Sequence, residues 1–216
     1  MPTAILHASN LAKVFNRRSI FSNINFVIPH GRSFAITGRN GSGKSTLVKI
    51  LAGVISPNDG NFTITLDGTE VKRDDIYRHV GLVAPYLQLY EEFSAWENLD
   101  LFRKLRGVDV PDVSLDGLLE KVGLYKRKHD LVRTYSSGMK QRLKYAFALL
   151  HEPEVLLLDE PTSNLDAEGM SMVSEVIAVH RTKGIVIVAT NVREEVQRCD
   201  ASLDLDADPA RQGVRS

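Results

Sequence analysis

The pattern of hydrophobic and polar positions divides the chain into three parts. Short apolar runs separated by turn sequences fill the first part, which is typical of β-strands. Apolar residues at helical spacing dominate the middle part, and the last part alternates apolar strands with helices. The strands that we expect are residues 4–8, 24–28, 34–37, 62–66, 80–84, 155–159 and 185–190. The helices that we expect are residues 44–51, 95–106, 115–122, 139–150, 167–180 and 194–198.

Two of the expected strands, 155–159 and 185–190, are apolar without any polar alternation. Such strands are covered on both faces, as in a parallel sheet. The alternation of strands with helices also favours a parallel sheet with right-handed crossovers. We therefore predict an α/β fold in which residues 3–206 form a single domain. The polar segment 207–216 is expected to be a loose C-terminal tail.

A glycine-rich loop lies between the expected strand at 34–37 and the expected helix at 44–51. Residues 38–45 fit the pattern G-x-x-x-x-G-K-[ST], with Gly38, Arg39, Asn40, Gly41, Ser42, Gly43, Lys44 and Ser45. Thr46, which directly follows, is a further candidate for nucleotide binding. Glycines let backbone N–H groups turn inward around phosphates, and the helix N-terminus adds partial positive charge. In such a loop Lys44 neutralises the β- and γ-phosphates of a nucleotide, and the Ser45 hydroxyl ligates Mg²⁺. A chance glycine-rich turn would lack the flanking strand and helix.

Two carboxylates, Asp159 and Glu160, end the apolar strand at 155–159. Ligands bind outside the carboxyl ends of the strands in open α/β sheets. Asp159 is therefore expected to hold Mg²⁺ through its water shell, and Glu160 to orient or deprotonate an attacking water. The alternative is a solvated strand end before the turn at Pro161. Together with the phosphate loop, the pair favours a catalytic site.

Composition and charge narrow the classes of function. Lys plus Arg and Asp plus Glu both number 27, so the chain lacks the basic excess of a dedicated nucleic-acid binder, and we expect no nucleic-acid partner. The single cysteine, Cys199, cannot form an internal disulfide, which suggests a reducing compartment. No stretch approaches the roughly 20 apolar residues of a membrane helix, and no signal-peptide pattern is evident. Any membrane association is therefore expected to depend on a partner.

A segment shortly before the acidic strand carries the resemblance to a known family. Residues 135–143 read Tyr-Ser-Ser-Gly-Met-Lys-Gln-Arg-Leu. They are similar to the signature motif of the ABC ATPases, in the variant common among exporter-type subunits, and the resemblance spans nearly the whole chain. It implies ATP as the nucleotide. It also implies a P-loop NTPase with a RecA-like parallel sheet core, an N-terminal antiparallel β subdomain and an inserted helical subdomain at about residues 86–150.

The resemblance implies a role for the start of the signature motif. In the family, Ser136, Ser137 and Gly138 would face the γ-phosphate of an ATP held by a second copy, so that two ATP molecules lie inside a head-to-tail dimer. A helix N-terminus that points at a phosphate is chemically sensible, because its backbone N–H groups and its dipole favour negative charge. Ser136 and Ser137 also fit a plain helix N-cap, which is an adequate local interpretation.

Two further positions are carried over from the family. Phe15 matches the aromatic residue that stacks on adenine, although a core phenylalanine would fit the sequence as well. The segment 163–166 matches the loop that couples the two ATP sites. Its last residue, Asp166, would also serve as a helix cap, and both roles could hold together.

The chain departs from the family pattern at two positions. Pro85 stands where the family has a glutamine, and proline has neither an N–H nor a polar side chain. Gln88 is a candidate substitute if the loop folds differently. Asn191 stands where the family has its switch histidine, and asparagine donates a hydrogen bond but cannot titrate. We therefore expect Mg-dependent ATP hydrolysis that is slower than in a family member with both residues.

Taken together, the chain resembles the ATP-hydrolysing motor subunit of a membrane transporter. It is most similar to exporter-type subunits, including the haem-exporter type of cytochrome c maturation. The implied partners are a transmembrane permease subunit and a second nucleotide-binding subunit, and the implied location is the cytoplasmic face of the inner membrane, reached through the permease. The aromatic-rich stretch 86–96 would form either subdomain core or a groove for a permease helix. The alternatives are a regulatory subunit with little hydrolysis and a soluble non-transport ABC ATPase.

Overall fold

The computed structural model describes residues 2–107 and 112–207. Its strands are β1 Ala4–Phe15, β2 Arg18–Pro29, β3 Ser33–Thr37, β4 Asp59–Leu66, β5 Thr69–Glu70, β6 Val80–Val83, β7 Val155–Asp159, β8 Ile185–Ala189 and β9 Ala201–Asp204. Its α-helices are α1 Lys44–Leu51, α2 Ile76–His79, α3 Ala95–Arg106, α4 Asp112–Lys121, α5 Ser137–Leu149, α6 Ala167–Arg181 and α7 Arg193–Gln197. Within the described ranges, no helix has the length and apolar character needed to cross a membrane.

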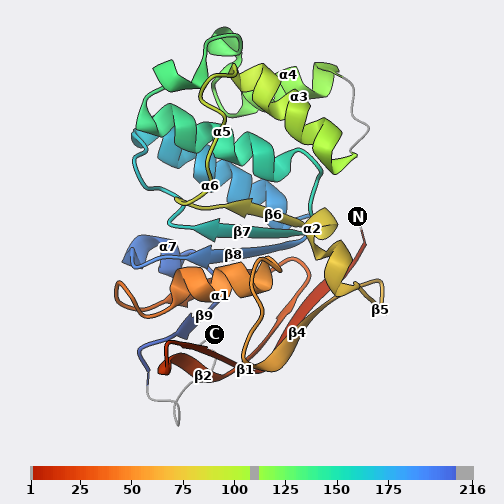
Figure 1. Cartoon of the computed structure of the whole chain (residues 1–216), viewed down its shortest axis with the longest axis vertical. Helices are drawn as coiled ribbons and strands as arrows, with labels where there is room; N and C mark the ends of the chain where they lie inside the picture. The colour runs from red at the N-terminus through yellow and green to blue at the C-terminus, as the bar shows by residue number, and fades with distance from the viewer. Residues whose placement is uncertain (1, 108–111, 208–216) are drawn as a thin grey trace.

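Two sheets form the frame of the molecule (Figure 1). The parallel sheet has the strand order β6-β7-β8-β3-β9, and the antiparallel sheet has the order β2-β1-β4-β5. Helix α1 packs on the face of the parallel sheet that looks toward the antiparallel sheet, and α3 to α6 lie on the opposite side. The expected α/β fold with an N-terminal antiparallel sheet is therefore confirmed. Most of the tail expected at 207–216 lies outside the described residues.

Two apolar cores cover the two faces of the parallel sheet. Val155 and Leu157 of β7 join the core with α1 and the antiparallel sheet, whereas Leu156 and Leu158 join the core with α3 to α6. All residues of β7 are buried, which is why the strand carries no polar alternation. The sheet is thus fixed from both sides, and its carboxyl edge is left to carry polar groups.

Strands with a weak pattern in the sequence differ most from expectation. Strand β1 continues to Phe15, because its second half also pairs with β2. Several register shifts interrupt the alternation of apolar and polar residues there, so the sequence pattern does not predict this half. Strand β9 is short and only partly buried, and it pairs with β3 from far along the chain. Strand β5 and helix α2 are also too short to show a period. Local pattern alone does not indicate these elements.

Helix α3 begins at a capping box, in which each partner satisfies a backbone N–H of the other. The Ser94 hydroxyl accepts a hydrogen bond from Glu97 N at 3.2 Å, and the Glu97 carboxylate accepts one from Ser94 N at 2.8 Å. These bonds lower the pKa of Glu97, first through the backbone N–H of Ser94. Gly107 ends the helix with a left-handed φ of 63°.

Replacing Ser94 with alanine removes this cap. We expect the free energy of unfolding to fall by about 1 kcal/mol at neutral pH. The loss should shrink as the pH falls through the lowered pKa of Glu97, because the carboxylate then stops accepting the hydrogen bond that the Ser94 hydroxyl donates at 2.7 Å and that alanine lacks. Urea denaturation of Ser94→Ala beside Ser22→Ala, an exposed control on β2, measures both effects. Equal stability of the two variants would contradict the assignment.

Candidate functional site

The carboxyl ends of three neighbouring strands bring the candidate residues together. Ala189 of β8 pairs with Ile36 of β3 on one side and with Asp159 of β7 on the other. The glycine-rich loop follows β3, Glu160 follows β7 and Asn191 follows shortly after β8. In Figure 1 the arrows of β7 and β8 point the same way, and the loop before α1 lies at the side where they end. Parallel pairing therefore places segments far apart in the sequence at one edge.

The glycine-rich loop depends on its glycines for its backbone conformation. Gly38, Gly41 and Gly43 have φ values of 141°, 84° and 104°, a region that favours glycine. A Cβ at Gly43 would lie 2.5 Å from Ile20 of β2, so the loop also packs too closely against the antiparallel sheet for any side chain there. The loop continues directly into α1 at Lys44, so its last N–H groups belong to a helix N-terminus.

Lys44 is folded into this loop. Its side chain is buried, and Nζ donates hydrogen bonds to the carbonyl oxygens of Gly38 at 2.7 Å and Arg39 at 3.1 Å. The Ser42 hydroxyl beside it is buried without a hydrogen-bond partner among the described residues. A buried ammonium held by neutral carbonyls is ready to exchange them for phosphate oxygens, which bind it more strongly.

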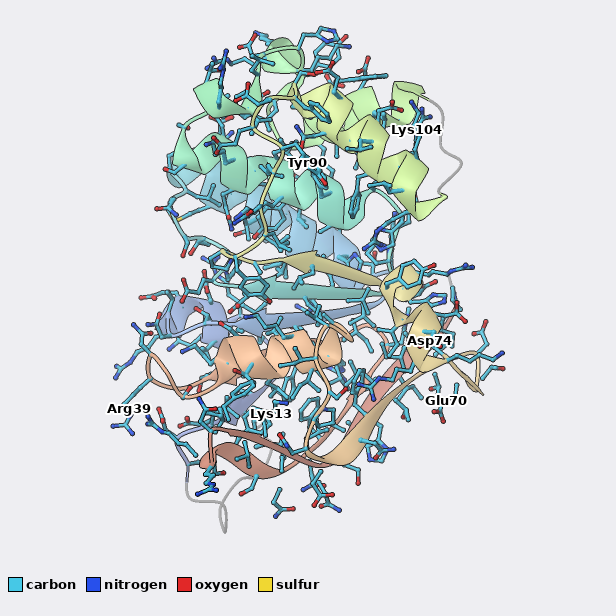
Figure 2. All side chains as sticks on the ribbon, viewed as in Figure 1. Lys13, Arg39, Glu70, Asp74, Tyr90 and Lys104 are labelled. Atoms are coloured by element: carbon cyan, nitrogen blue, oxygen red, sulfur yellow. The ribbon has the colours of Figure 1, made fainter. Side chains whose placement is uncertain are left out.

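Two longer-range contacts hold the first half of the loop. Arg39 N donates to the Asp206 carboxylate at 2.5 Å, and Asn191 Nδ2 donates to Asn40 Oδ1 at 3.3 Å. The Arg39 side chain itself is 87% exposed and points away from the body of the molecule (Figure 2). Asn191 therefore contacts the phosphate loop directly, whereas the Arg39 side chain does not line the cavity described next.

A cavity of about 220 Å³ collects the second half of the loop together with Glu160. Its lining residues come from β2, the loop, the start of α1 and the end of β7: Ile20, Asn40, Gly41, Gly43, Lys44, Ser45, Thr46 and Glu160. Backbone N–H groups, an ammonium and a carboxylate thus face one small space. This combination suits a phosphate chain with a water beside it.

Asp159 is buried at the end of β7, directly before the Glu160 that lines this cavity. It is 1% exposed, and neither carboxylate oxygen has a hydrogen-bond partner among the described residues. Burial raises the pKa of Asp159, and the nearby Ser45 hydroxyl opposes that rise in part. An unpaired buried carboxylate is costly, and a cation removes that cost. The oxygen atoms of Asp159 and Ser45 are ligands of the type that Mg²⁺ prefers, so the pair fits this ion.

Glu160 adopts a left-handed backbone conformation with φ of 52°, which is uncommon for a residue with a side chain. Its N–H donates to Ala189 O at 2.9 Å, which holds this conformation against β8. Its carboxylate is exposed and accepts a hydrogen bond from Ser163 Oγ at 3.3 Å. Strained backbone of this kind persists only where the surrounding structure enforces it, and it clusters at functional sites.

Phe15 stands at the exposed end of the β1–β2 hairpin. The residue is 46% exposed and pairs with Arg18, and the Lys13 ammonium lies 4.8 Å from its ring centre. The hairpin reaches the phosphate site, because Ile20 of the following strand lines the cavity. Phe15 is therefore not a core residue, and its ring is available for stacking.

The signature segment caps a helix and does not line the cavity around Lys44. Ser136 is the N-cap of α5, with its hydroxyl accepting from Met139 N at 3.2 Å, and Ser137 and Gly138 begin the helix. Ser136 and Ser137 are both exposed. A Cβ at Gly138 would lie 2.9 Å from Asn164 O, so the helix start approaches the segment 163–166 closely.

Asp166 links this segment to two helices. Its carboxylate accepts from Gly169 N at 2.8 Å as the N-cap of α6, and from Arg142 of α5 at 2.7 Å. These bonds lower its pKa, with the Gly169 bond as the largest cause. The expected capping role of Asp166 is thus present, together with a link to α5 that the sequence did not indicate.

The structure places Gln88 away from the phosphate loop. It lines a separate groove between α3, α5 and β6, whereas Tyr86 does not line that groove and contacts α1 instead. Lys49 of α1 lies 4.1 Å from the Tyr86 ring, and burial together with the charge of Asp159 raises the pKa of the Tyr86 hydroxyl. Tyr86 therefore lies against the helix that follows the phosphate loop, a contact that the sequence did not indicate. The only feature of the sequence that could have drawn attention to Tyr86 is its position directly after Pro85.

Asp206 is the other residue that sequence reasoning missed. It follows β9, an element that the local pattern does not indicate, and it reaches the phosphate loop only because β9 pairs with β3. The bond to Arg39 N lowers the pKa of Asp206, so the carboxylate stays charged beside the loop. No local motif marks such a contact.

Comparisons with known proteins agree with this geometry. A family model described as "ABC transporter" matches residues 21–163. The lantibiotic transport ATP-binding protein SrtF of Streptococcus pyogenes is 37% identical over 194 residues, which cover 89% of this chain and 82% of SrtF. The bacitracin transport ATP-binding protein BcrA of Enterococcus faecalis is 34% identical over 198 residues, which cover 90% of this chain and 63% of BcrA.

Solved structures show the same fold. A structure of an ATP-binding subunit of an ABC transporter matches with a TM-score of 0.85 at 25% identity, covering 98% of this chain and 90% of the other. A bacterial Atm1-family ABC exporter with ATP bound matches with a TM-score of 0.82 at 20% identity, covering 98% of this chain and 38% of that one, and supports the fold alone. The family model and the relatives span the phosphate loop, the signature segment and the acidic pair. The chain belongs to the ABC transporter family, as one of its ATP-binding proteins.

Proposed function

We propose that this chain is the ATP-hydrolysing motor subunit of an exporter-type ABC transporter. The observation that carries the proposal is one cavity lined by the second half of the phosphate loop, including Lys44 and Ser45, and by Glu160. Directly before Glu160 stands the buried Asp159, whose carboxylate lacks a hydrogen-bond partner among the described residues. ATP hydrolysis is implied by membership of the family, and the transport role is supported by the names of the relatives.

The nucleotide would be held by the residues that the sequence singled out. The phosphate-loop residues Gly38 to Thr46 would surround the phosphates with backbone N–H groups and the Lys44 ammonium. Phe15 would stack on adenine. Ser45 and Asp159 would hold Mg²⁺, which supplies positive charge to the β- and γ-phosphates when bound. The sharing of one cavity by the loop and Glu160 supports this arrangement.

Glu160 is the proposed base, or the residue that orients the attacking water. Its exposed carboxylate lines the same cavity as Lys44, and its backbone is fixed by Ala189. Asn191 would hold the water or the γ-phosphate by a hydrogen bond, but it cannot exchange a proton. With Pro85 at the glutamine position, we infer slower hydrolysis than in a family member with both polar residues.

The signature segment would act on a second ATP-binding subunit. Ser136, Ser137 and Gly138 do not line this chain's own phosphate cavity, and both serines are exposed at a helix N-terminus. An exposed helix N-terminus attracts a phosphate, which supports a head-to-tail dimer with ATP at the interface. Asp166 would couple the two sites, because it joins the segment 163–166 to α5 and α6.

An apolar groove of about 440 Å³ between α3, α5 and β6 would receive a permease segment. Val54, Tyr77, Tyr90 and Leu105 line it with exposed side chains, and Figure 2 labels Tyr90 in the connection between β6 and α3. Large apolar residues exposed together mark an interaction surface. This groove would anchor the chain at the cytoplasmic face of the membrane through its partner.

Charge suggests what the permease segment carries. Arg106 and Lys144 also line the groove, and its described lining includes no aspartate or glutamate. Arg106 donates to Tyr77 O at 2.8 Å and has no carboxylate partner among the described residues. Burial lowers the pKa of both Arg106 and Lys144, as expected for cations without a counter-ion. We therefore propose an amphipathic segment with a carboxylate.

Turnover of Mg-ATP by the purified protein tests the enzymatic role. The Glu160→Gln variant should keep ATP affinity within about twofold and lose at least about 10²-fold in kcat, because the amide cannot take up a proton. Steady-state phosphate release and calorimetric ATP binding measure the two quantities. ATP binding without any turnover above that of the variant would favour the regulatory alternative.

Restoring an imidazole at the switch position tests the reason for slow turnover. Asn191→His should raise kcat by about tenfold or more at neutral pH, because a titratable group then holds the water. Asn191→Gln, which keeps an amide, is the matched control and should not raise kcat. A kcat unchanged by the histidine would mean that Asn191 does not limit turnover.

Photo-crosslinking from the groove tests the membrane partner. Benzoylphenylalanine at Leu105, which is 70% exposed, should give a light-dependent adduct with an integral membrane protein in cells, whereas the same group at Val27 on β2 should not. Arg106→Glu should reduce the adduct strongly, since it repels a carboxylate. Lys104→Glu, a charge change outside the groove, should leave it intact. Equal adducts with both charge variants would contradict the acidic segment.

A further inference from the structure

Helix α5 contacts two different parts of the molecule with two of its faces. Lys144, Phe147 and Ala148 line the apolar groove. Gln141 and Tyr145 reach instead toward the residues that follow Glu160. The helix whose N-terminus carries the signature segment therefore also contacts the loop that holds the proposed base.

The contact with that loop is a buried hydrogen bond. Tyr145 is 0% exposed, and its hydroxyl donates to Pro161 O at 2.9 Å. Gln141 Nε2 approaches the same oxygen at 3.5 Å. Burial, with a smaller contribution from the charge of Glu195, raises the pKa of Tyr145 well above its ordinary value, so the hydroxyl keeps the proton that it donates. Pro161 directly follows Glu160, so this bond holds the Pro161–Thr162 peptide group, one residue beyond the proposed base.

The same short loop is tied on its other sides. Glu160 N donates to Ala189 O of β8 at 2.9 Å, and Thr162 Oγ1 donates to Glu195 of α7 at 2.6 Å. Residues 160–162 are thus held by β8, α7 and α5 at once. Because Glu160 has a left-handed φ of 52°, its backbone needs such support to persist.

We propose that Tyr145 is a positioning residue for Glu160, which acts by holding Pro161 O and so fixing the direction of the Glu160 carboxylate. The inference rests on the proposed role of Glu160 in hydrolysis. The inference also connects the groove with the proposed base through α5, because Lys144, the residue directly before Tyr145, lines that groove. A segment that binds in the groove would contact the same helix that holds residues 160–162 in place.

The rival explanation is that Tyr145 only fills the core. The two explanations separate at the hydroxyl, because a phenylalanine ring occupies the same volume and lacks only the bond to Pro161 O. Tyr145→Phe should lower kcat about tenfold and leave the KM for ATP and the affinity for ATP unchanged. Val122→Ala, which trims a buried side chain of the same apolar core, is the control for lost stability and should leave kcat unchanged.

A second measurement does not depend on turnover. Amide hydrogen exchange of the segment 160–166 should be faster in Tyr145→Phe than in the unchanged protein and in Val122→Ala. The N–H groups of Ser163 and Leu165 report the change, because they bond to Glu160 O and Thr162 O within this loop. Exchange that is unchanged in Tyr145→Phe would overturn the proposal whatever the turnover.

The double variant tests whether Tyr145 acts through Glu160. In Glu160→Gln, the further change Tyr145→Phe should not lower the residual single-turnover rate, since the group being positioned is already gone. A full additional tenfold loss, or a normal kcat for Tyr145→Phe alone, would overturn the proposal. If the unchanged protein shows no turnover, the proposed hydrolysis fails, and the exchange measurement alone then decides the structural part.

Discussion

The in-register pairing of Ala189 with strands on both sides is the constraint from which the site follows. Its neighbours are Ile36 of β3 and Asp159 of β7, and the backbone continues the same order, with Thr190 N bonded to Ile36 O. A slip of one residue in either pairing would move each side chain of the slipped strand from one apolar core to the other. The two apolar cores therefore fix the register, and the register fixes which loops meet. The positions of the polar residues at the carboxyl edge therefore depend on the apolar packing within the sheet.

Support for the edge comes from elements on both sides of the sheet. Ile20 of the antiparallel sheet packs closely against Gly43, so an apolar side chain limits the conformation of the phosphate loop on that side. Helix α5 approaches from the other side, with Arg142 on Asp166 and Tyr145 on Pro161. One helix thus joins the signature segment, the groove and the loop after β7. In the proposed function, this makes α5 the part through which a membrane partner and a bound nucleotide influence each other.

Much of this could be predicted where a local pattern carries the information. The phosphate loop, the acidic pair and the apolar strands were readable, because each motif sits between elements with a clear period. The contact between Asp206 and Arg39 was not, since it joins residues at opposite ends of the chain through a short edge strand. Nor could the sequence show that Gln88 lies in the groove while Tyr86 lies against Lys49 of α1. The direction of a side chain in an irregular loop depends on tertiary packing, which no local spacing encodes.

Lys44 has a consequence for how a ligand leaves. In the free protein its ammonium already has two acceptors, the carbonyls of Gly38 and Arg39, in the loop that would hold the phosphates. Departure of a phosphate group therefore does not strand a buried charge, because the lysine returns to acceptors a short distance away. Binding and release become an exchange of partners at one nitrogen. In the proposed function, the carbonyls of Gly38 and Arg39 compete with the phosphates for the Lys44 ammonium, and this competition moderates the affinity for a nucleotide.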